Sequence, residues 1–274
     1  MPTLPTGGRS LTLERFDHNL CPNASSCDLS KLTFIDAYGL VATACALLAS
    51  LGSGDPPPLR SPVQEQVRTH LALMGFGTLL EHLGYMPDLP VTSPPERPDV
   101  LVPLERITSD FAAEQLSHLL WENLRREADP QVLNATLEGL WELAANAIEH
   151  SGAEAVIMGQ VYRRGEPPDH LNRVQVVVGD AGRGIMRSLV ESGRYKPRDD
   201  LEAIELALGY LVTSVDDPGR GQGLYTTMEW VTALQGKLVV RSGATKVTLE
   251  SGPARSERVP FLDGTIVCMS LPLG

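Results

Sequence analysis

Apolar side chains recur with the period of a helix between residues 130 and 150. Steps of three or four residues place them on one face of a helix, and a proline near the start suits the first helical turn. We expect the helix to begin at Asp129-Pro130 and to end at Ser151-Gly152. Its apolar face consists of Leu133, Leu137, Leu140, Trp141, Ala144 and Ile148.

Glu142, Asn146 and His150 follow one another at four-residue steps along the same predicted helix. Four residues turn a helix by about 400°, so the three side chains line one edge. A carboxylate one turn before a carboxamide could activate water or a hydroxyl group next to a bound metal ion. An amphipathic helix with a polar edge is the simpler interpretation of this stretch taken alone.

Residues 1–93 have the pattern of a small α/β domain. Alternation of apolar and polar positions predicts its strands, and helical periodicity predicts its helices, the second of them broken near Gly75 and Gly77. A proline-rich run at 94–103 then predicts a semi-rigid linker between two domains. The predicted elements are strands at 10–16 and 29–36 and helices at 37–52 and 61–84.

Residues 104–274 alternate between helical periodicity and short apolar strands. Strands joined as hairpins, with helices gathered between them, predict a mixed sheet with helices on one face, which is an α+β sandwich. The predicted helices are 111–127, 130–150, 199–214 and 223–236, and the predicted strands are 153–164, 172–180, 237–243, 245–252 and 264–273.

Composition narrows the class of protein. The net charge of −11 disfavours a general nucleic-acid binder or an anionic-membrane binder, because both need basic surface. Four scattered cysteines form no Cys-x-x-Cys pair, so neither a zinc site nor a redox dithiol is predicted. The longest apolar run, 37–51, is shorter than the roughly 20 residues that cross a bilayer. We therefore expect a soluble cytoplasmic protein without a secretory signal.

Two glycine-rich clusters accompany the polar edge. Asp180-Ala181-Gly182-Arg183-Gly184 directly follows an apolar strand, so its aspartate could accept a hydrogen bond from an exocyclic amine such as that of adenine. Gly219-Arg220-Gly221-Gln222-Gly223-Leu224 opens a predicted helix, where exposed N–H groups suit phosphate. The second cluster follows Asp216-Asp217-Pro218 and not a strand, which excludes a Rossmann dinucleotide site. No P-loop sequence occurs.

Three motifs follow one another along the chain and resemble those of the GHKL ATPase family. They are Glu-x-x-x-Asn, Asp-x-Gly-x-Gly and Gly-x-Gly-x-Gly-Leu. That family includes gyrase, the large heat-shock chaperones, histidine kinases and mismatch-repair ATPases, and the anti-sigma-factor serine kinases share its domain. The resemblance covers about residues 105–274. It implies the GHKL (Bergerat) two-layer α/β sandwich and binding of ATP with Mg²⁺.

The resemblance also implies roles for the polar edge. Glu142 matches the family's general base, and Asn146 matches the asparagine that coordinates Mg²⁺. His150 stands where the anti-sigma-factor kinases have histidine, in Asn-Ala-Ile-x-His, and it either touches phosphate or caps the helix. Glu149 stands where histidine kinases have lysine, so the chain departs from that branch.

The remaining matches concern the nucleotide itself. Asp180 corresponds to the aspartate that recognises adenine, with two glycines of the same cluster shaping the pocket wall. The lid glycines correspond to amides that hold phosphate, and a threonine near the C-terminus supports the adenine contact. These residues are Gly182 and Gly184, then Gly219, Gly221, Gly223 and Leu224, then Thr265.

Asp36-Ala37-Tyr38-Gly39 resembles the Asp-Ser-Ser/Thr-Gly motif of STAS domains, the fold of anti-sigma-factor antagonists. Ala37 occupies the position at which that family is phosphorylated, so this domain is expected to dock or sense without receiving phosphate. A generic small α/β domain explains residues 1–93 nearly as well.

These resemblances lead to two functional hypotheses. The first is a cytosolic Mg²⁺-ATP-binding regulatory protein, a kinase or slow ATPase of the anti-sigma-factor serine kinase type with a protein partner. The second is a non-catalytic ATP-sensing module that switches a partner. A homodimer through the helix at 111–127 is possible under either, whereas Trp121, Trp141 and Trp230 are expected to pack in the core or at its rim.

Overall fold

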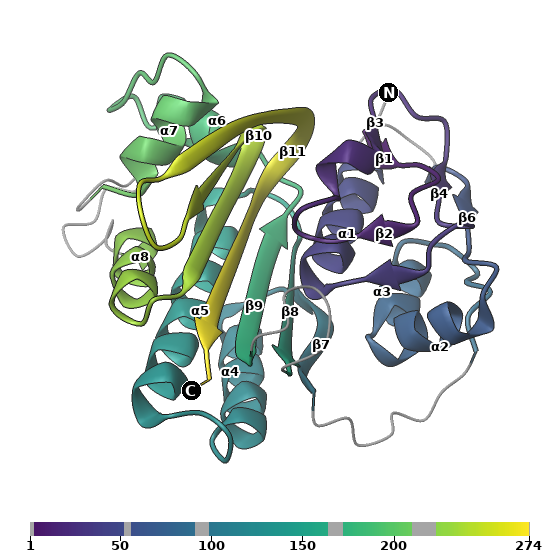
Figure 1. The fold of residues 1–274 in the computed structure, drawn as a ribbon. Coiled ribbons are helices and arrows are strands. Elements are labelled where there is room, and N and C mark those ends of the chain that lie inside the picture. The colour runs from purple at the N-terminus through teal and green to yellow at the C-terminus, as the bar shows by residue number, and fades with distance from the viewer. Residues whose placement is uncertain (1–2, 52–55, 91–98, 164–171, 210–222, 274) are drawn as a thin grey trace.

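A five-stranded sheet forms the centre of the computed structural model, which describes residues 3–51, 56–90, 99–163, 172–209 and 223–273 (Figure 1). Its strand order is β10-β11-β9-β8-β7, and every neighbouring pair is antiparallel. The prediction of a mixed sheet is therefore wrong within these residues, because even the strands separated by helices, such as β7 and β8, pair antiparallel. The strands are β7 Val100–Ile107, β8 Ala155–Tyr162, β9 Arg173–Asp180, β10 Lys237–Leu249 and β11 Arg255–Pro272.

One face of this sheet carries the helices of the C-terminal half. Helix α4 (Asp110–Leu124) packs on α5 (Pro130–His150), and α5 packs on α8 (Gly223–Ala233) and on the strands beneath. Helices α6 (Gly184–Glu191) and α7 (Asp200–Ala207) pack together beside β10 (Figure 1). This half of the chain thus forms helices over one antiparallel sheet, in agreement with the predicted α+β arrangement.

Helix α1 (Ala37–Leu51) covers the opposite face of the sheet, where it packs against β8, β9 and β11 (Figure 1). Thirteen of its residues are buried, which explains its nearly unbroken apolar sequence. Gly179 on β9 lets the helix approach, because a Cβ at that position would lie 2.6 Å from Cys45 Sγ. The described chain therefore has three layers, whereas the sequence predicted two layers and a separate domain.

The N-terminal segment contains less strand than its alternating pattern predicts. The strands expected at 10–16 and 29–36 shrink to β2 (Ser10–Leu11) and β5 (Phe34–Ile35), which pair in parallel. The rest of this segment consists of other two-residue strands, a 3₁₀ turn and connecting turns, and α3 follows α2 after a break at Gly75, as predicted. The further elements are β1 Leu4–Pro5, β3 Leu20–Cys21, β4 Cys27–Asp28, β6 Leu59–Arg60, α2 Glu65–Leu73 and α3 Phe76–His82.

The ends of α5 are the ones that the sequence predicts. The Asp129 carboxylate accepts a hydrogen bond of 2.9 Å from the Gln131 N–H, and Pro130 occupies the first turn. At the other end Ser151 is the C-cap and Gly152 has φ +67°, a conformation that favours glycine. The polar edge of this helix is thereby fixed in register.

Three features of the C-terminal half differ from the sequence prediction. Residues 100–103 of the predicted linker belong to β7, while its first residues, through 98, lie outside the described chain. The strands predicted at 237–243 and 245–252 form one strand, β10, with an irregular register around Gly243. Helix α6 was not predicted, since it begins inside the glycine cluster.

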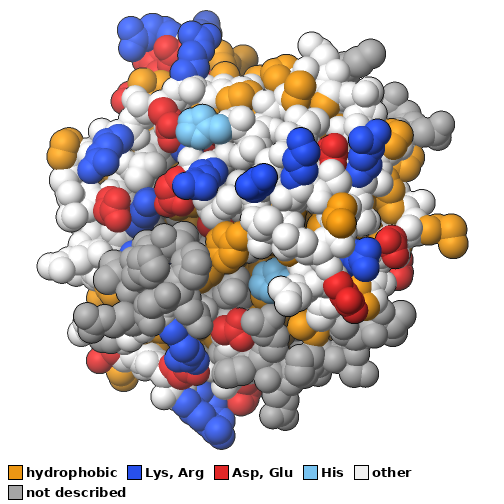
Figure 2. Space-filling model, turned by 45° about the vertical axis from the view of Figure 1, so that its right-hand side comes forward, with side chains coloured by type: hydrophobic (Ala, Val, Ile, Leu, Met, Phe, Trp, Pro, Cys, Tyr) orange, Lys and Arg blue, Asp and Glu red, His pale blue; other side chains and the backbone are white. Residues whose placement is uncertain are grey.

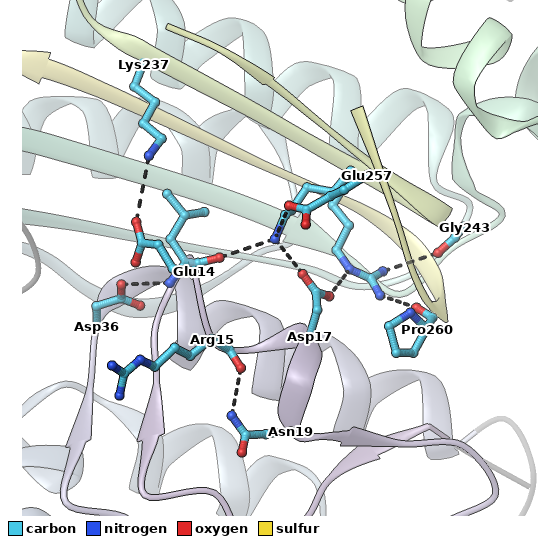
Figure 3. A network of polar contacts seen from close by, with 12 residues as sticks. Glu14, Arg15, Asp17, Asn19, Asp36, Lys237, Gly243, Glu257 and Pro260 are labelled. Atoms are coloured by element: carbon cyan, nitrogen blue, oxygen red, sulfur yellow. Dashed lines mark hydrogen bonds and ion pairs between the residues drawn. The ribbon is translucent and has the colours of Figure 1, made fainter. Parts of the chain in front are cut away.

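A buried ion network joins the N-terminal segment to β10 (Figure 3). The Asp17 carboxylate accepts bonds of 3.0 Å from Arg241 Nε and 2.8 Å from Lys246 Nζ. Arg241 also donates to the carbonyls of Gly243 and Pro260, and Lys246 pairs with Glu257. Burial lowers the pKa of Lys246, but Asp17 and Glu257 outweigh this effect and raise it, so the amine stays charged.

The outer surface carries charges of both signs. Figure 2 shows basic, acidic and apolar side chains interspersed over the face that it presents. Among the helices of the described chain, none combines the length and apolar character needed to cross a membrane.

Candidate functional site

A pocket of about 130 Å³ opens where α5, β9, α6, α8 and β11 converge. Most of its walls are apolar, and a few polar groups point into it, the composition typical of sites for small ligands. Many of the residues singled out by the sequence line it together, namely Asn146, His150, Asp180, Gly184, Gly223, Leu224 and Thr265. The motifs, far apart in sequence, therefore meet in one cavity.

Asp180 is the buried acid of this pocket. Its side chain is 6% exposed and lies at the end of β9. Burial raises its pKa to about 7, although the N–H groups of Gly182 and Thr265 donate to the carboxylate and oppose the shift. The Gly182 bond measures 2.8 Å. The described residues give this carboxylate no cationic partner, so a donor from a ligand would lower the cost of ionising it.

Glycines allow the backbone to close around Asp180. Gly264 has φ +84°, and a Cβ there would collide with the Asp180 carbonyl oxygen. A Cβ on Gly182 would collide with the Ser151 carbonyl oxygen at the end of α5. These two positions bring β11 and the α5 terminus close to the aspartate, but Gly182, predicted to shape the wall of this pocket, lines a neighbouring cavity.

Ser242 is a site residue that the sequence did not reveal. Its hydroxyl accepts a 2.9 Å bond from the Ile185 N–H, lies 3.2 Å from the Gly264 carbonyl oxygen, and lies 3.3 Å from Thr265 Oγ1. It therefore connects β10, the first turn of α6 and β11 behind the pocket. No local motif marks it, since its role depends on which backbone atoms the fold brings near.

Glu142 and Asn146 flank the start of α8. Both are half-buried, and a Cβ on Gly223 would collide with Glu142 Oε2 and lie 3.3 Å from Asn146 Nδ2. Asn146 lines the pocket, whereas Glu142 lies just beyond it and lines a neighbouring groove. The predicted pair thus lies side by side against the first turn of α8, with the acid at the edge of the cavity.

Other predicted residues lie elsewhere. Gly219 and Gly221 fall outside the described residues, so the predicted phosphate-holding loop is represented by Gly223 and Leu224 alone. Arg183 pairs with Glu191 at 2.9 Å and lines a different cavity.

A metal ion would need ligands from outside the chain. No group of three His, Cys, Asp or Glu side chains able to hold a metal occurs in the part of the chain described. Asn146 offers one carboxamide oxygen at the pocket wall. Mg²⁺ commonly keeps several waters and takes oxygens from a bound phosphate, so this donor set fits Mg²⁺ only in company with such a ligand.

The Asp36-Ala37 turn of the N-terminal segment is closed. The Asp36 carboxylate accepts bonds of 3.0 Å from the Leu13 N–H and 2.7 Å from the Gly39 N–H. Ala37 is fully buried, and its N–H donates to the Tyr162 hydroxyl of β8 at 2.9 Å. A side chain at this position faces the interface with the sheet, where no phosphoryl donor could reach it.

The sequence matches no protein-family model, and a comparison with curated proteins finds no match.

Proposed function

We propose that this chain binds Mg²⁺-ATP in the pocket at the end of β9 and acts as a regulatory protein kinase or slow ATPase of the anti-sigma-factor serine kinase type. The observation that carries the proposal is Asp180, a buried carboxylate in a largely apolar cavity, to which the described residues give no cationic partner. An exocyclic amine of adenine supplies the donor that such a group lacks. Asn146 and Gly223 lie on the same cavity wall, where phosphate and its metal ion would sit.

Glu142 supplies the chemistry in this proposal. A hydroxyl oxygen attacks the γ-phosphorus, the bond from that phosphorus to the β-phosphate bridging oxygen breaks, and ADP leaves. Glu142 takes the hydroxyl proton, which makes the attacking oxygen a better nucleophile. Asn146 would hold Mg²⁺ through its carboxamide oxygen, and the metal supplies charge neutralisation for the phosphates when it is bound.

Titration of the full chain with ATP, in Mg²⁺ and in EDTA, tests the binding. We expect saturable binding that weakens in EDTA and weakens equally in an Asn146→Ala variant. Absence of ATP binding by a folded protein would refute the proposal.

Glu142→Gln tests the chemistry. It should retain ATP affinity and lose about 10²–10⁴-fold in γ-phosphate release or transfer, the usual contribution of a general base. Glu229→Gln is the matched control, because Glu229 is an exposed glutamate on α8.

A non-catalytic ATP sensor is the second candidate. One observation favours it: Arg241, which binds the N-terminal segment, directly precedes Ser242, whose hydroxyl contacts Ile185 and Thr265 of the pocket wall. Occupancy of the pocket could therefore alter the N-terminal interface without turnover. Equal γ-phosphate release by wild type and Glu142→Gln, with ATP bound by both, would select this candidate.

A further inference from the structure

A groove of about 500 Å³ runs along the outer side of α4, α5 and α8, next to the candidate nucleotide pocket. Its walls combine aromatic rings with carboxylates, and of these residues only Glu142 takes part in the chemistry proposed for the pocket. The six side chains that matter here are Glu114, His118 and Trp121 of α4 and Glu138, Trp141 and Glu142 of α5.

The two tryptophans of the groove are unusually open for their size. Trp121 is 39% exposed and Trp141 is 42% exposed, although the sequence predicted core or rim packing for both. The guanidinium carbon of Arg125 lies 4.8 Å from the centre of the Trp121 ring. The chain itself thus shows that a cation can stack on this aromatic surface, a contact that gains strength when it is shielded from water.

Apart from Arg125, which stacks on Trp121, the described charged side chains at the groove are acidic. Three glutamates line it, and none of the described lining residues is a lysine or an arginine. The Trp230 indole N–H donates a 2.7 Å bond to Glu138, which fixes that carboxylate in place. Half-exposed indole rings beside three carboxylates, one of them held in place, form a surface complementary to arginine or lysine side chains.

Glu142 connects the groove to the pocket. It lines the groove, and its Oε2 lies against Gly223 at the start of α8 together with Asn146 of the pocket wall. A chain segment lying in the groove would therefore bring its side chains to the proposed general base from outside the nucleotide cavity.

We propose that this groove docks a basic segment of the protein that accepts the phosphoryl group, with arginine or lysine side chains on Trp121 and Trp141 and a serine or threonine hydroxyl at Glu142. The inference rests on the proposed function for its chemistry. The docking itself depends only on the rings and carboxylates. The acceptor hydroxyl loses its proton to Glu142 as its oxygen bonds to the γ-phosphorus and ADP departs.

Peptide binding to the full chain without nucleotide tests the docking. The probe is a dye-labelled peptide with three arginines alternating with alanine around one serine, and its twin has glutamate in place of arginine. We expect the basic peptide to bind with a Kd below about 1 mM by fluorescence anisotropy, and the acidic twin not to bind. Trp141→Ala and the double variant Glu114→Gln/Glu138→Gln should each weaken binding about tenfold or more, whereas Glu229→Gln should not.

Three results would overturn the docking proposal. They are no binding of the basic peptide, equal binding of the acidic twin, and a dimer of the wild type that Trp121→Ala dissociates in sedimentation, which would assign the groove to a second copy. The ATP titration described above is measured separately on the same samples. Peptide binding without ATP binding would refute the proposed function and leave the cationic docking intact, and the reverse result would refute only the docking.

Discussion

Two buried aspartates in this molecule have opposite electrostatic surroundings. Asp17, in the N-terminal segment, contacts two buried cations of β10, Arg241 and Lys246. Asp180, at the end of β9, receives from the described residues only backbone N–H donors and faces a cavity. A buried carboxylate with ion partners holds the fold together, whereas one without them needs a donor from elsewhere. The first arrangement is typical of an interface within the fold, and the second is typical of a binding site.

Asp36 shows that burial alone does not define a site. Like Asp180, it precedes a helix, accepts two backbone N–H bonds and has its pKa raised to about 7 by burial. Unlike Asp180, it is buried where the N-terminal segment meets the sheet, and it lines none of the three cavities described above. The two aspartates therefore share a raised pKa, and they differ in that only Asp180 lines one of these cavities.

Removing Asp17 should produce the largest effect. Asp17→Ala leaves Arg241, 1% exposed, and Lys246, 5% exposed, without their shared carboxylate. Breaking a buried ion cluster from one side typically costs about 3–5 kcal/mol, and we expect the free energy of unfolding in urea at pH 7 to fall by that amount.

Glu122→Ala serves as the control, because it removes only a surface pair with Arg125 and should change stability little. A loss of under about 1 kcal/mol in Asp17→Ala would mean that the interface does not depend on the ion network.

Much of the fold was predictable because its signals are local. Helix α5 has a capping aspartate, a first-turn proline and a terminal glycine within its own sequence. Strand β7 was missed because Pro103 and its proline-rich surroundings resemble a linker. An edge strand tolerates proline, and the register of β7 shifts on both sides of Val102, between Val100 and Glu105.

The interface and part of the site were not predictable, because they depend on distant contacts. Asp17 and Arg241 are separated by 224 positions, and neither lies in a recognisable pattern. Asn146, Asp180 and Thr265 could be grouped through their motifs, and the structure does place them around one pocket. Ser242 could not, since only the folded register of β10 and β11 brings it to the Gly264 carbonyl.

Asp36 should make stability depend on pH. Its carboxyl ionises near pH 3.9 in an unfolded chain and near 7 in the folded one, so between these values the folded state holds an extra proton. Stability therefore falls as pH rises through this interval, by up to about 1.4 kcal/mol per pH unit and about 4 kcal/mol in total. Urea midpoints of wild type and Asp36→Asn between pH 4 and 8 measure the difference.

Asp36→Asn keeps a neutral side chain with an acceptor oxygen, so the variant should lose this part of the pH slope and keep the part due to other groups. If stability changed with pH by the same amount in wild type and variant, Asp36 would be ionised in the folded protein throughout the range. Its pKa would then not resemble that of Asp180.

Replacing Asp180 should produce the smallest of these effects, a change in ligand affinity that is specific to the pocket. An exocyclic amine donates a stronger hydrogen bond to the ionised carboxylate than to the neutral acid, and burial raises the pKa of Asp180 to about 7, so affinity should rise with pH below 7 and level off above it. Adenosine is the ligand to titrate, because it carries no phosphate that changes charge between pH 5 and 8. Asp180→Asn should bind weakly and without pH dependence, while Asp36→Asn should keep the wild-type profile because Asp36 does not face the pocket. If the adenosine affinity of the wild type did not change with pH, Asp180 would not be the partner of the adenine base. The contrast between Asp36, which is closed off, and Asp180, which faces a ligand pocket, would then be lost.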